Sequence, residues 1–154
     1  MSVIENRLRE IGLALPSAPS PMANYVTCLQ VDNLVYTSGA SCFVDGRPIY
    51  TGRLGTDLTI EQGYEASRIT ALNLLSVIKA EIGDLDRIER IVKVLGLVSS
   101  AQDFYEQPRV INGASDLFVE VFGEKGMHTR SALGTSVLPF NIPVEIEMIV
   151  QVKV

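Results

Sequence analysis

Apolar residues recur at helical spacing in three segments of the chain. The middle segment gives the clearest signal, because Thr59 and Gln62 form a capping-box pattern at its start and Gly83 is a suitable C-terminal stop. Three prolines in residues 16–21 separate the first segment from the rest of the chain, because a proline ring cannot continue a helix. The predicted helices are Ser2–Leu13, a long helix from Thr59 to Gly83, and Phe104–Phe122, which begins near Pro108.

Shorter segments show the patterns of β-strands. Residues 144–154 alternate apolar and polar side chains with a period of two, whereas residues 88–98 are rich in Ile and Val throughout, as in a buried strand. The turn pair Asp32-Asn33 joins two further strands in a hairpin. The predicted strands are Tyr25–Val31, Leu34–Ser38, a short strand at Arg47–Tyr50, Ile88–Val98, Ser131–Leu138 and Val144–Val154.

The order of these elements predicts an α+β fold in which one sheet carries the two long helices on one face. Only the short N-terminal helix is left to cover the other face of the sheet. An apolar sheet face without cover inside the chain predicts that the protein forms oligomers.

The composition is that of an ordinary globular protein, because 47% of the 154 residues are apolar and 20% are charged, which excludes intrinsic disorder. The length matches one domain, and we expect residues 1–154 to form a single unit. The formal net charge of −5 argues against nucleic acid as a main partner, because phosphate binding requires a basic face.

The patterns of secreted, membrane and metal-binding chains are absent from the sequence. The N-terminus has no apolar signal region, and the longest apolar run, Ile91–Val98, contains Lys93 and is too short to span a membrane. Cys28 and Cys42 fit neither a disulfide framework nor a zinc pattern, and we expect both to be reduced and buried. We therefore predict a cytoplasmic protein with no metal, no cofactor and no membrane partner.

Few residues suggest chemistry, and the P-loop, G-x-S-x-G, H-E-x-x-H and G-x-G-x-x-G motifs are all absent. His128 is the single histidine, and we interpret it as a surface loop residue, because no neighbouring Ser or Cys in the sequence suggests a nucleophile pair. Arg130 opens a strand that has no other charge, where its guanidinium could grip a carboxylate through two hydrogen bonds or simply be solvated. Glu145 and Glu147 point to one face of the last strand, where one of them could act as an acid or base if an oligomer buries it.

The C-terminal pattern resembles that of the RidA/YjgF family of reactive-intermediate imine deaminases, whose members often carry the label L-PSP endoribonuclease. The shared features are an Arg-Ser strand entry, a Leu-Pro corner and an (Ile/Val)-Glu-Ile-Glu-x-Ile finish, here Arg130-Ser131, Leu138-Pro139 and residues 144–149. In the N-terminal half, residues 33–39 end in Ser-Gly like the family's strand, and Tyr25 and Asn112 match its site tyrosine and asparagine. Residues 1–20, a helical extension and a Pro-rich linker, lie outside the resemblance.

The resemblance implies a chorismate-mutase-like fold and a homotrimer in which three sheets form a central barrel with substrate sites between subunits. It implies that Arg130 holds the carboxylate of a small imine or keto acid and that Glu145 positions or activates the attacking water. Tyr25, Gly39 and Asn112 would line the pocket. The implied reaction is hydrolysis of 2-aminoacrylate-type enamines and imines to 2-keto acids and ammonia, which needs placement, a proton for nitrogen and a water molecule.

Two departures from the family pattern leave other functions open. Ala132 stands where many family deaminases have cysteine, and Met127-His128-Thr129 replaces the usual Pro-Ala type of approach. One alternative is therefore a non-catalytic module that binds small carboxylates or keto acids through Arg130. A further alternative is the endoribonuclease activity of the family label, against which the acidic net charge and the single histidine argue.

Overall fold

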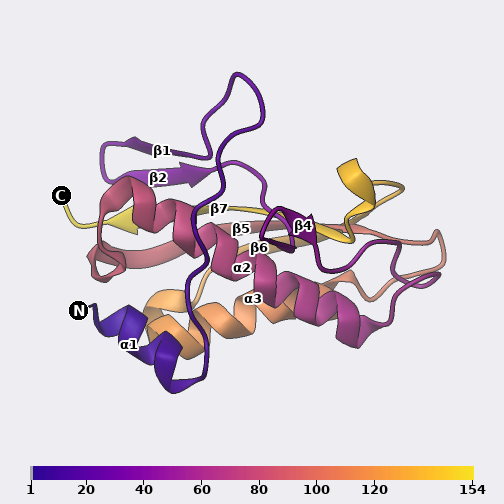
Figure 1. The fold of residues 1–154 in the computed structure, drawn as a ribbon. Helices are drawn as coiled ribbons and strands as arrows, with labels where there is room; N and C mark the ends of the chain where they lie inside the picture. Colours follow the sequence, from indigo (N-terminus) through magenta and orange to yellow (C-terminus); the bar gives the residue numbers. More distant parts are fainter. Residues whose placement is uncertain (1) are drawn as a thin grey trace.

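Two layers make up the fold, a five-stranded mixed sheet and a pair of long helices that lie against one of its faces (Figure 1). The computed structural model describes residues 2–154. The sheet has the strand order β1-β2-β7-β5-β6, with β1 (Cys28–Val31), β2 (Leu34–Thr37), β5 (Ile88–Ser99), β6 (Thr129–Thr135) and β7 (Val144–Val152). The helices are α1 (Val3–Glu10), α2 (Ile60–Ile82) and α3 (Gln107–Phe122), and a separate small hairpin pairs β3 (Phe43–Val44) with β4 (Arg47–Pro48).

The last strand of the chain occupies the centre of the sheet. β7 runs antiparallel to both of its neighbours, β2 and β5, whereas β6 lies parallel to β5 at one edge. The parallel pair requires a crossover, which α3 provides. The sheet therefore joins segments that are far apart in the sequence.

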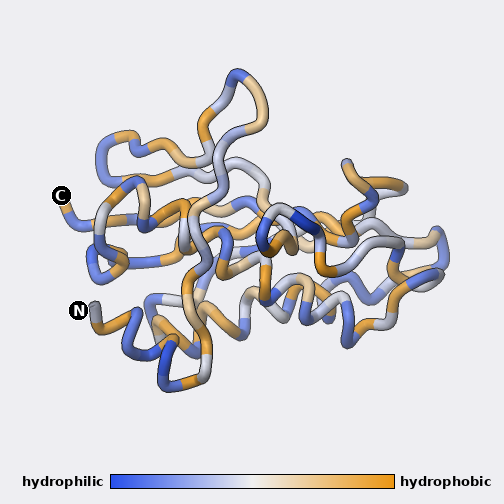
Figure 2. Tube along the Cα trace, viewed as in Figure 1, coloured by the Kyte–Doolittle hydropathy of each residue, from blue (hydrophilic) through white to orange (hydrophobic). Residues whose placement is uncertain are grey.

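Alternation along β7 separates the core from the open face of the sheet. Five of its apolar side chains point to the helices and are at most 2% exposed, whereas Ile149 lies on the open face: the five are Val144, Ile146, Met148, Val150 and Val152. Figure 2 shows hydrophobic and hydrophilic positions alternating along the strands and helices. Burial of these five side chains holds the two layers together.

A glycine allows α2 and α3 to pack at close range. A Cβ atom at Gly113 would lie 1.9 Å from the backbone oxygen of Tyr64, so no other residue fits there without a shift of one helix. This contact fixes the position of α3, and with it the neighbouring Asn112, relative to α2.

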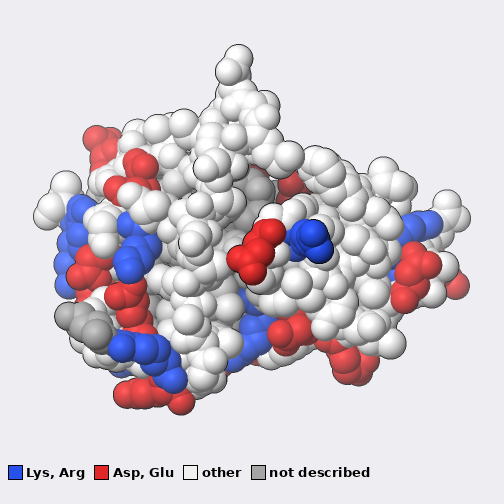
Figure 3. All heavy atoms as spheres, in the orientation of Figure 1, with Lys and Arg blue, Asp and Glu red and all other residues white. Residues whose placement is uncertain are grey.

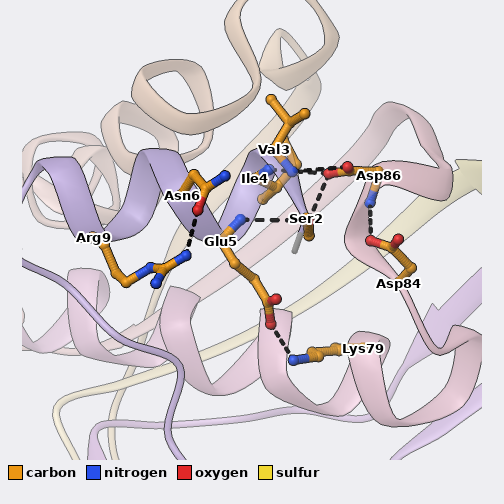
Figure 4. Close-up of polar contacts among 9 residues, drawn as sticks. All are labelled: Ser2, Val3, Ile4, Glu5, Asn6, Arg9, Lys79, Asp84 and Asp86. Carbon is orange, nitrogen blue, oxygen red and sulfur yellow. Dashed lines mark hydrogen bonds and ion pairs between the residues drawn. The ribbon is translucent and has the colours of Figure 1, made fainter.

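The N-terminal helix is anchored by one carboxylate of the 3₁₀ turn η1 (Leu85–Arg87), as Figure 4 shows. Asp86 accepts hydrogen bonds from the Ser2 hydroxyl (2.6 Å), the Val3 backbone N–H (2.8 Å) and the Ile4 backbone N–H (3.0 Å). Burial alone would raise the pKa of Asp86, but these hydrogen bonds outweigh it and lower the pKa below its usual value. Asp86 therefore supplies the cap that the first N–H groups of α1 require.

Side chains complete the attachment of α1. Glu5 pairs with Lys79 of α2, and the Arg7 Nη1 atom donates to the backbone oxygen of Val121 in α3 at 2.9 Å. Ile4 and Leu8 are 7% and 1% exposed, so the apolar face of α1 belongs to the hydrophobic core.

The α+β class, the mixed sheet and the three helices that the sequence predicts are confirmed, and the Thr59–Gln62 capping box is present. Several predicted ends are wrong. The first helix stops at Glu10 instead of Leu13, because Gly12 takes a positive φ of 76°. The strand predicted at Arg47–Tyr50 is only the two residues of β4, because its partner β3 has only two residues, and a single further hydrogen bond joins Ile49 to the backbone oxygen of Cys42.

The predicted ends of two strands, β1 and β6, are wrong for the same reason: each strand stops where its hydrogen-bonded partner stops. Residues 25–27 lie outside β1, since β2 ends at Thr37, the partner of Cys28. Residues 136–138 lie outside β6, since β5 ends at Ser99 and the chain then turns into the 3₁₀ turn η3 (Pro139–Asn141). β6 also begins two residues earlier than expected, at Thr129.

No helix or strand of residues 2–154 covers the second face of the sheet. It exposes large apolar side chains, namely Leu29 (53%), Val31 (51%), Tyr36 (41%) and Leu133 (52%). The segment between α1 and β1 crosses the helix layer and then projects as a loop, and residues 14–27 carry no charge (Figures 1 and 3). Figure 3 shows no acidic or basic side chains on the projecting loop, whereas they occur at the α1 end, in the centre and at the opposite end of this view. Among the helices of residues 2–154, none is long and apolar enough to cross a membrane.

Candidate functional site

Arg130 lies on the edge strand β6 and points to the helix side of the sheet. It pairs with Val94 of β5, whose side chain is fully buried against the helices, and residues paired in this way share a face. The Arg130 Nη1 atom donates to the Asn112 Oδ1 atom at 2.8 Å and to the Ser115 Oγ atom at 3.1 Å. The structure thus brings together two of the residues predicted from the sequence, Arg130 and Asn112.

Both hydrogen atoms on Nη1 of Arg130 are used by these two contacts. Within residues 2–154, no hydrogen bond or ion pair engages Nε or Nη2 of this guanidinium. The Nε and Nη2 donors lie along one edge of the planar group, which matches the two oxygen atoms of a carboxylate. Arg130 is therefore held on one side and free to bind an anion on the other.

Ser115 and His128 are part of this arrangement and were not predicted from the sequence. The Ser115 Oγ atom lies 2.9 Å from the His128 Nε2 atom, and the His128 Nδ1 atom lies 2.6 Å from the backbone oxygen of Gly126. His128 lies in a loop, as predicted, but the interpretation as a surface residue is wrong, because it is half-buried and the chain reversal after α3 returns it to that helix. Burial and, secondarily, the charge of Arg130 lower the pKa of His128 below its usual value.

The signal for Ser115 was present in the sequence as helical spacing. Asn112 and Ser115 are three residues apart on α3 and so share one face of the helix. What the sequence does not show is that β6 places Arg130 against that face.

Gly39 and Glu145 form a second group on the open side of the sheet. A Cβ atom at Gly39 would lie 2.7 Å from the Glu145 Oε1 atom, so the backbone of Gly39 approaches this carboxylate closely. Glu145 is half-buried, and no hydrogen bond or ion pair in the described part of the chain engages its carboxylate. Burial first, and the charge of Glu147 second, raise the pKa of Glu145 above its usual value.

Tyr25 lies in the projecting loop and is 48% exposed. Its hydroxyl accepts a 3.5 Å hydrogen bond from the Met22 backbone N–H. Ser38, beside Gly39, ties the following residues of the loop to the sheet through bonds to the backbone oxygens of Val26 (2.6 Å) and Thr27 (2.9 Å). The loop that carries Tyr25 is thereby anchored near the Gly39–Glu145 group.

One chain does not bring the predicted site residues together. Glu145 pairs with Leu97 of β5 and points away from the helices, whereas Arg130 points toward them from β6. The residues form two half-sites on opposite faces of the sheet, Arg130 with Asn112 on one and Gly39 with Glu145 on the other. A shallow pocket of about 320 Å³ lies beside Asn112 between α2 and α3 and is lined by Ile60, Glu61, Tyr64 and Arg109.

The two cysteines take no part in either half-site. Both are free and buried, as expected, and burial raises the pKa of the Cys28 thiol to about 11. No group of three or more His, Cys, Asp or Glu side chains in residues 2–154 has the geometry to hold a metal ion.

Nearly the whole chain matches a known protein family. Residues 5–151 match the family described as "YjgF/chorismate mutase-like, putative endoribonuclease". The chain is similar to the structure of Atu1372 from Agrobacterium tumefaciens, a protein of unknown function, with 43% identity, a TM-score of 0.92 and coverage of 98% of this chain and 93% of that one.

Two curated proteins are also similar along most of the chain. Protein TCP17 of Trypanosoma cruzi is 41% identical over 147 residues, which are 95% of this chain and 92% of that protein. A 2-iminobutanoate/2-iminopropanoate deaminase of Dermatophagoides farinae is 28% identical over 141 residues, which are 92% of this chain and 95% of the deaminase.

Proposed function

The chain belongs to the YjgF/RidA family, and on that premise we propose that it hydrolyses imines of 2-keto acids to the keto acid and ammonia. The observation that carries the proposal is the state of Arg130, whose Nη1 atom is held by Asn112 and Ser115 while its Nε–Nη2 edge is free. Such an edge suits a substrate with a carboxylate next to the reacting carbon. The similarity to a curated deaminase supports the same reaction class.

We assign the second role to Glu145. Imine hydrolysis adds water across the C=N bond and then expels ammonia from the tetrahedral carbon. A half-buried carboxylate with a raised pKa is suited to orient the water, accept its proton and return a proton to the leaving nitrogen. Gly39 contributes the backbone that lies against this carboxylate.

A complete site in this proposal lies between subunits of a homotrimer. The half-sites face opposite sides of the sheet, so Arg130 and Asn112 of one subunit would meet Gly39 and Glu145 of the next. The exposed apolar residues on the open face support this assembly, because association would bury them. The projecting loop would bring Tyr25 toward the same cleft.

The test is the rate of keto-acid release from imines that an amino-acid oxidase generates in situ. We expect the protein to accelerate release and the Arg130→Ala variant to lose about 100-fold or more in kcat/KM, because the carboxylate loses its anchor. Arg68→Ala is the matched control, since Arg68 lies on α2 in the helix layer, where it pairs with Glu120 and with neither half-site, and it should retain full activity. Equal rates for the wild type and Arg130→Ala would contradict the proposal.

Ala132 favours a second candidate, a module that binds carboxylates without turnover. It follows Arg130 by two residues on the same face and replaces the cysteine that many family deaminases have there. Calorimetric binding of keto acids without accelerated imine hydrolysis would support this function instead. RNA cleavage that is abolished in Arg130→Ala would support the endoribonuclease activity in the family description.

A further inference from the structure

A continuous set of hydrogen bonds links the single histidine to the arginine of the proposed site. It runs from the Gly126 backbone oxygen to His128, from His128 to Ser115, and from Ser115 to Arg130. The donor–acceptor distances along it are 2.6, 2.9 and 3.1 Å. All three side chains are partly buried, which limits competition from water.

The chemistry of the partners fixes the direction of each bond. Because the Gly126 oxygen can only accept, the His128 Nδ1 atom carries the proton and donates to it. In the neutral ring the Nε2 atom then has a lone pair, which accepts the Ser115 hydroxyl proton. The Ser115 oxygen keeps its own lone pairs for the Arg130 Nη1–H, since a guanidinium can only donate.

We propose that Ser115 and His128 are positioning residues that hold the Arg130 guanidinium by Nη1 and present its Nε–Nη2 edge to the substrate carboxylate. Asn112 provides the second acceptor on Nη1, so the guanidinium plane is fixed at two points. The inference rests on the proposed role of Arg130 as the carboxylate anchor.

The same contacts couple the binding of a carboxylate to the protonation of His128. Arg130 is the charged group that acts on the His128 ring. The other neighbours of the ring are uncharged: Ser115, the Gly126 backbone oxygen, and Phe118, whose ring lies edge-on with its centroid 5.9 Å from that of His128. A carboxylate on Arg130 offsets the positive charge that opposes the imidazolium. Binding should therefore raise the pKa of His128 toward its ordinary value, and by reciprocity carboxylates should bind more tightly as the pH falls through that pKa.

The test uses the imidazole of His128 as its own NMR probe, because the chain has a single histidine. The ring is titrated with and without saturating 2-oxobutanoate in the wild type, Ser115→Ala and Ser115→Thr. We expect the ligand to raise the pKa of His128 in the wild type. Ser115→Ala should bind 2-oxobutanoate about 3- to 10-fold more weakly, and Ser115→Thr should restore binding because it keeps the hydroxyl.

Turnover separates this inference from the proposed function. If Ser115→Ala raises KM and changes kcat little while Ser115→Thr restores KM, both are supported. Ligand-dependent titration of His128 without any imine hydrolysis overturns only the proposed function. Three results would each overturn the positioning role. They are an unchanged affinity of Ser115→Ala for 2-oxobutanoate, a pKa of His128 that is the same with and without the ligand, and a wild type that does not bind 2-oxobutanoate.

Discussion

At the scale of single residues, Glu145 is placed where an ionised carboxylate is unfavourable. It is half-buried beside Glu147, and its raised pKa means that the folded protein holds the proton more tightly than the unfolded chain does. The ionised form is therefore destabilising, and this effect appears as the pH rises above the usual carboxylate range.

Glu145→Gln should consequently separate stability from activity. We expect imine hydrolysis to fall by about 100-fold or more, because the proton acceptor is lost. The Tm measured at pH 8 should stay equal to that of the wild type or rise by about 1–2 °C, and the difference should vanish near pH 3.5, where both states of the wild type are protonated.

Glu147→Gln is the matched control for Glu145→Gln, since Glu147 is exposed on the same face of β7. It should keep turnover far above that of Glu145→Gln, and because the charge of Glu147 is the second cause of the raised pKa of Glu145, it should also lower that pKa. A large loss of Tm in Glu145→Gln, or full activity in that variant, would refute the assignment of Glu145.

At the scale of secondary-structure elements, α1 depends on a carboxylate outside the helix. Asp86→Ala removes the acceptor for three donors at the helix start and should destabilise the protein by about 1–2 kcal/mol. Amide hydrogen exchange should show the loss in residues 3–10 first. Exchange that stays as slow as in the wild type would contradict this account.

The pH dependence of α1 follows from the same residue. The folded-state pKa of Asp86 is lowered, so its contribution is complete above the usual carboxylate pKa and is lost as the pH falls through the lowered value. Glu89→Ala, which removes a nearby exposed acid, should keep the wild-type behaviour.

The sequence predicted the elements well where the signal is local. The capping box of α2 and the helical pattern of α3 depend on neighbouring residues, and both helices are where the sequence placed them. The ends of β1 and β6 were wrong because a strand ends where its partner ends, and that partner is distant in the sequence. The contact of His128 with Ser115 could not be predicted for a similar reason, because it depends on how the loop before β6 folds back against α3.

At the scale of the whole molecule, the open face of the sheet is the surface on which oligomerisation should depend. We expect a solution mass of three chains for the wild type. Tyr36→Asp, which places a charge among the exposed apolar residues of this face, should shift the mass toward one chain and abolish activity.

Val119→Asp provides the control for Tyr36→Asp. Val119 is also exposed (37%) but belongs to α3, in the helix layer. This variant should remain trimeric in sedimentation. A monomeric wild type, or a trimer that survives Tyr36→Asp, would argue against a site shared between subunits.

The central position of β7 has a consequence for biosynthesis. A nascent chain that has reached Pro143 contains β1 and β2 as one pair and β5 and β6 as another, with nothing to join them. The strand that unites the two pairs, β7, leaves the ribosome after the other four strands of the sheet. The protein should therefore complete its sheet only after β7 has been synthesised, and until then the apolar faces of α2 and α3 lack part of their cover.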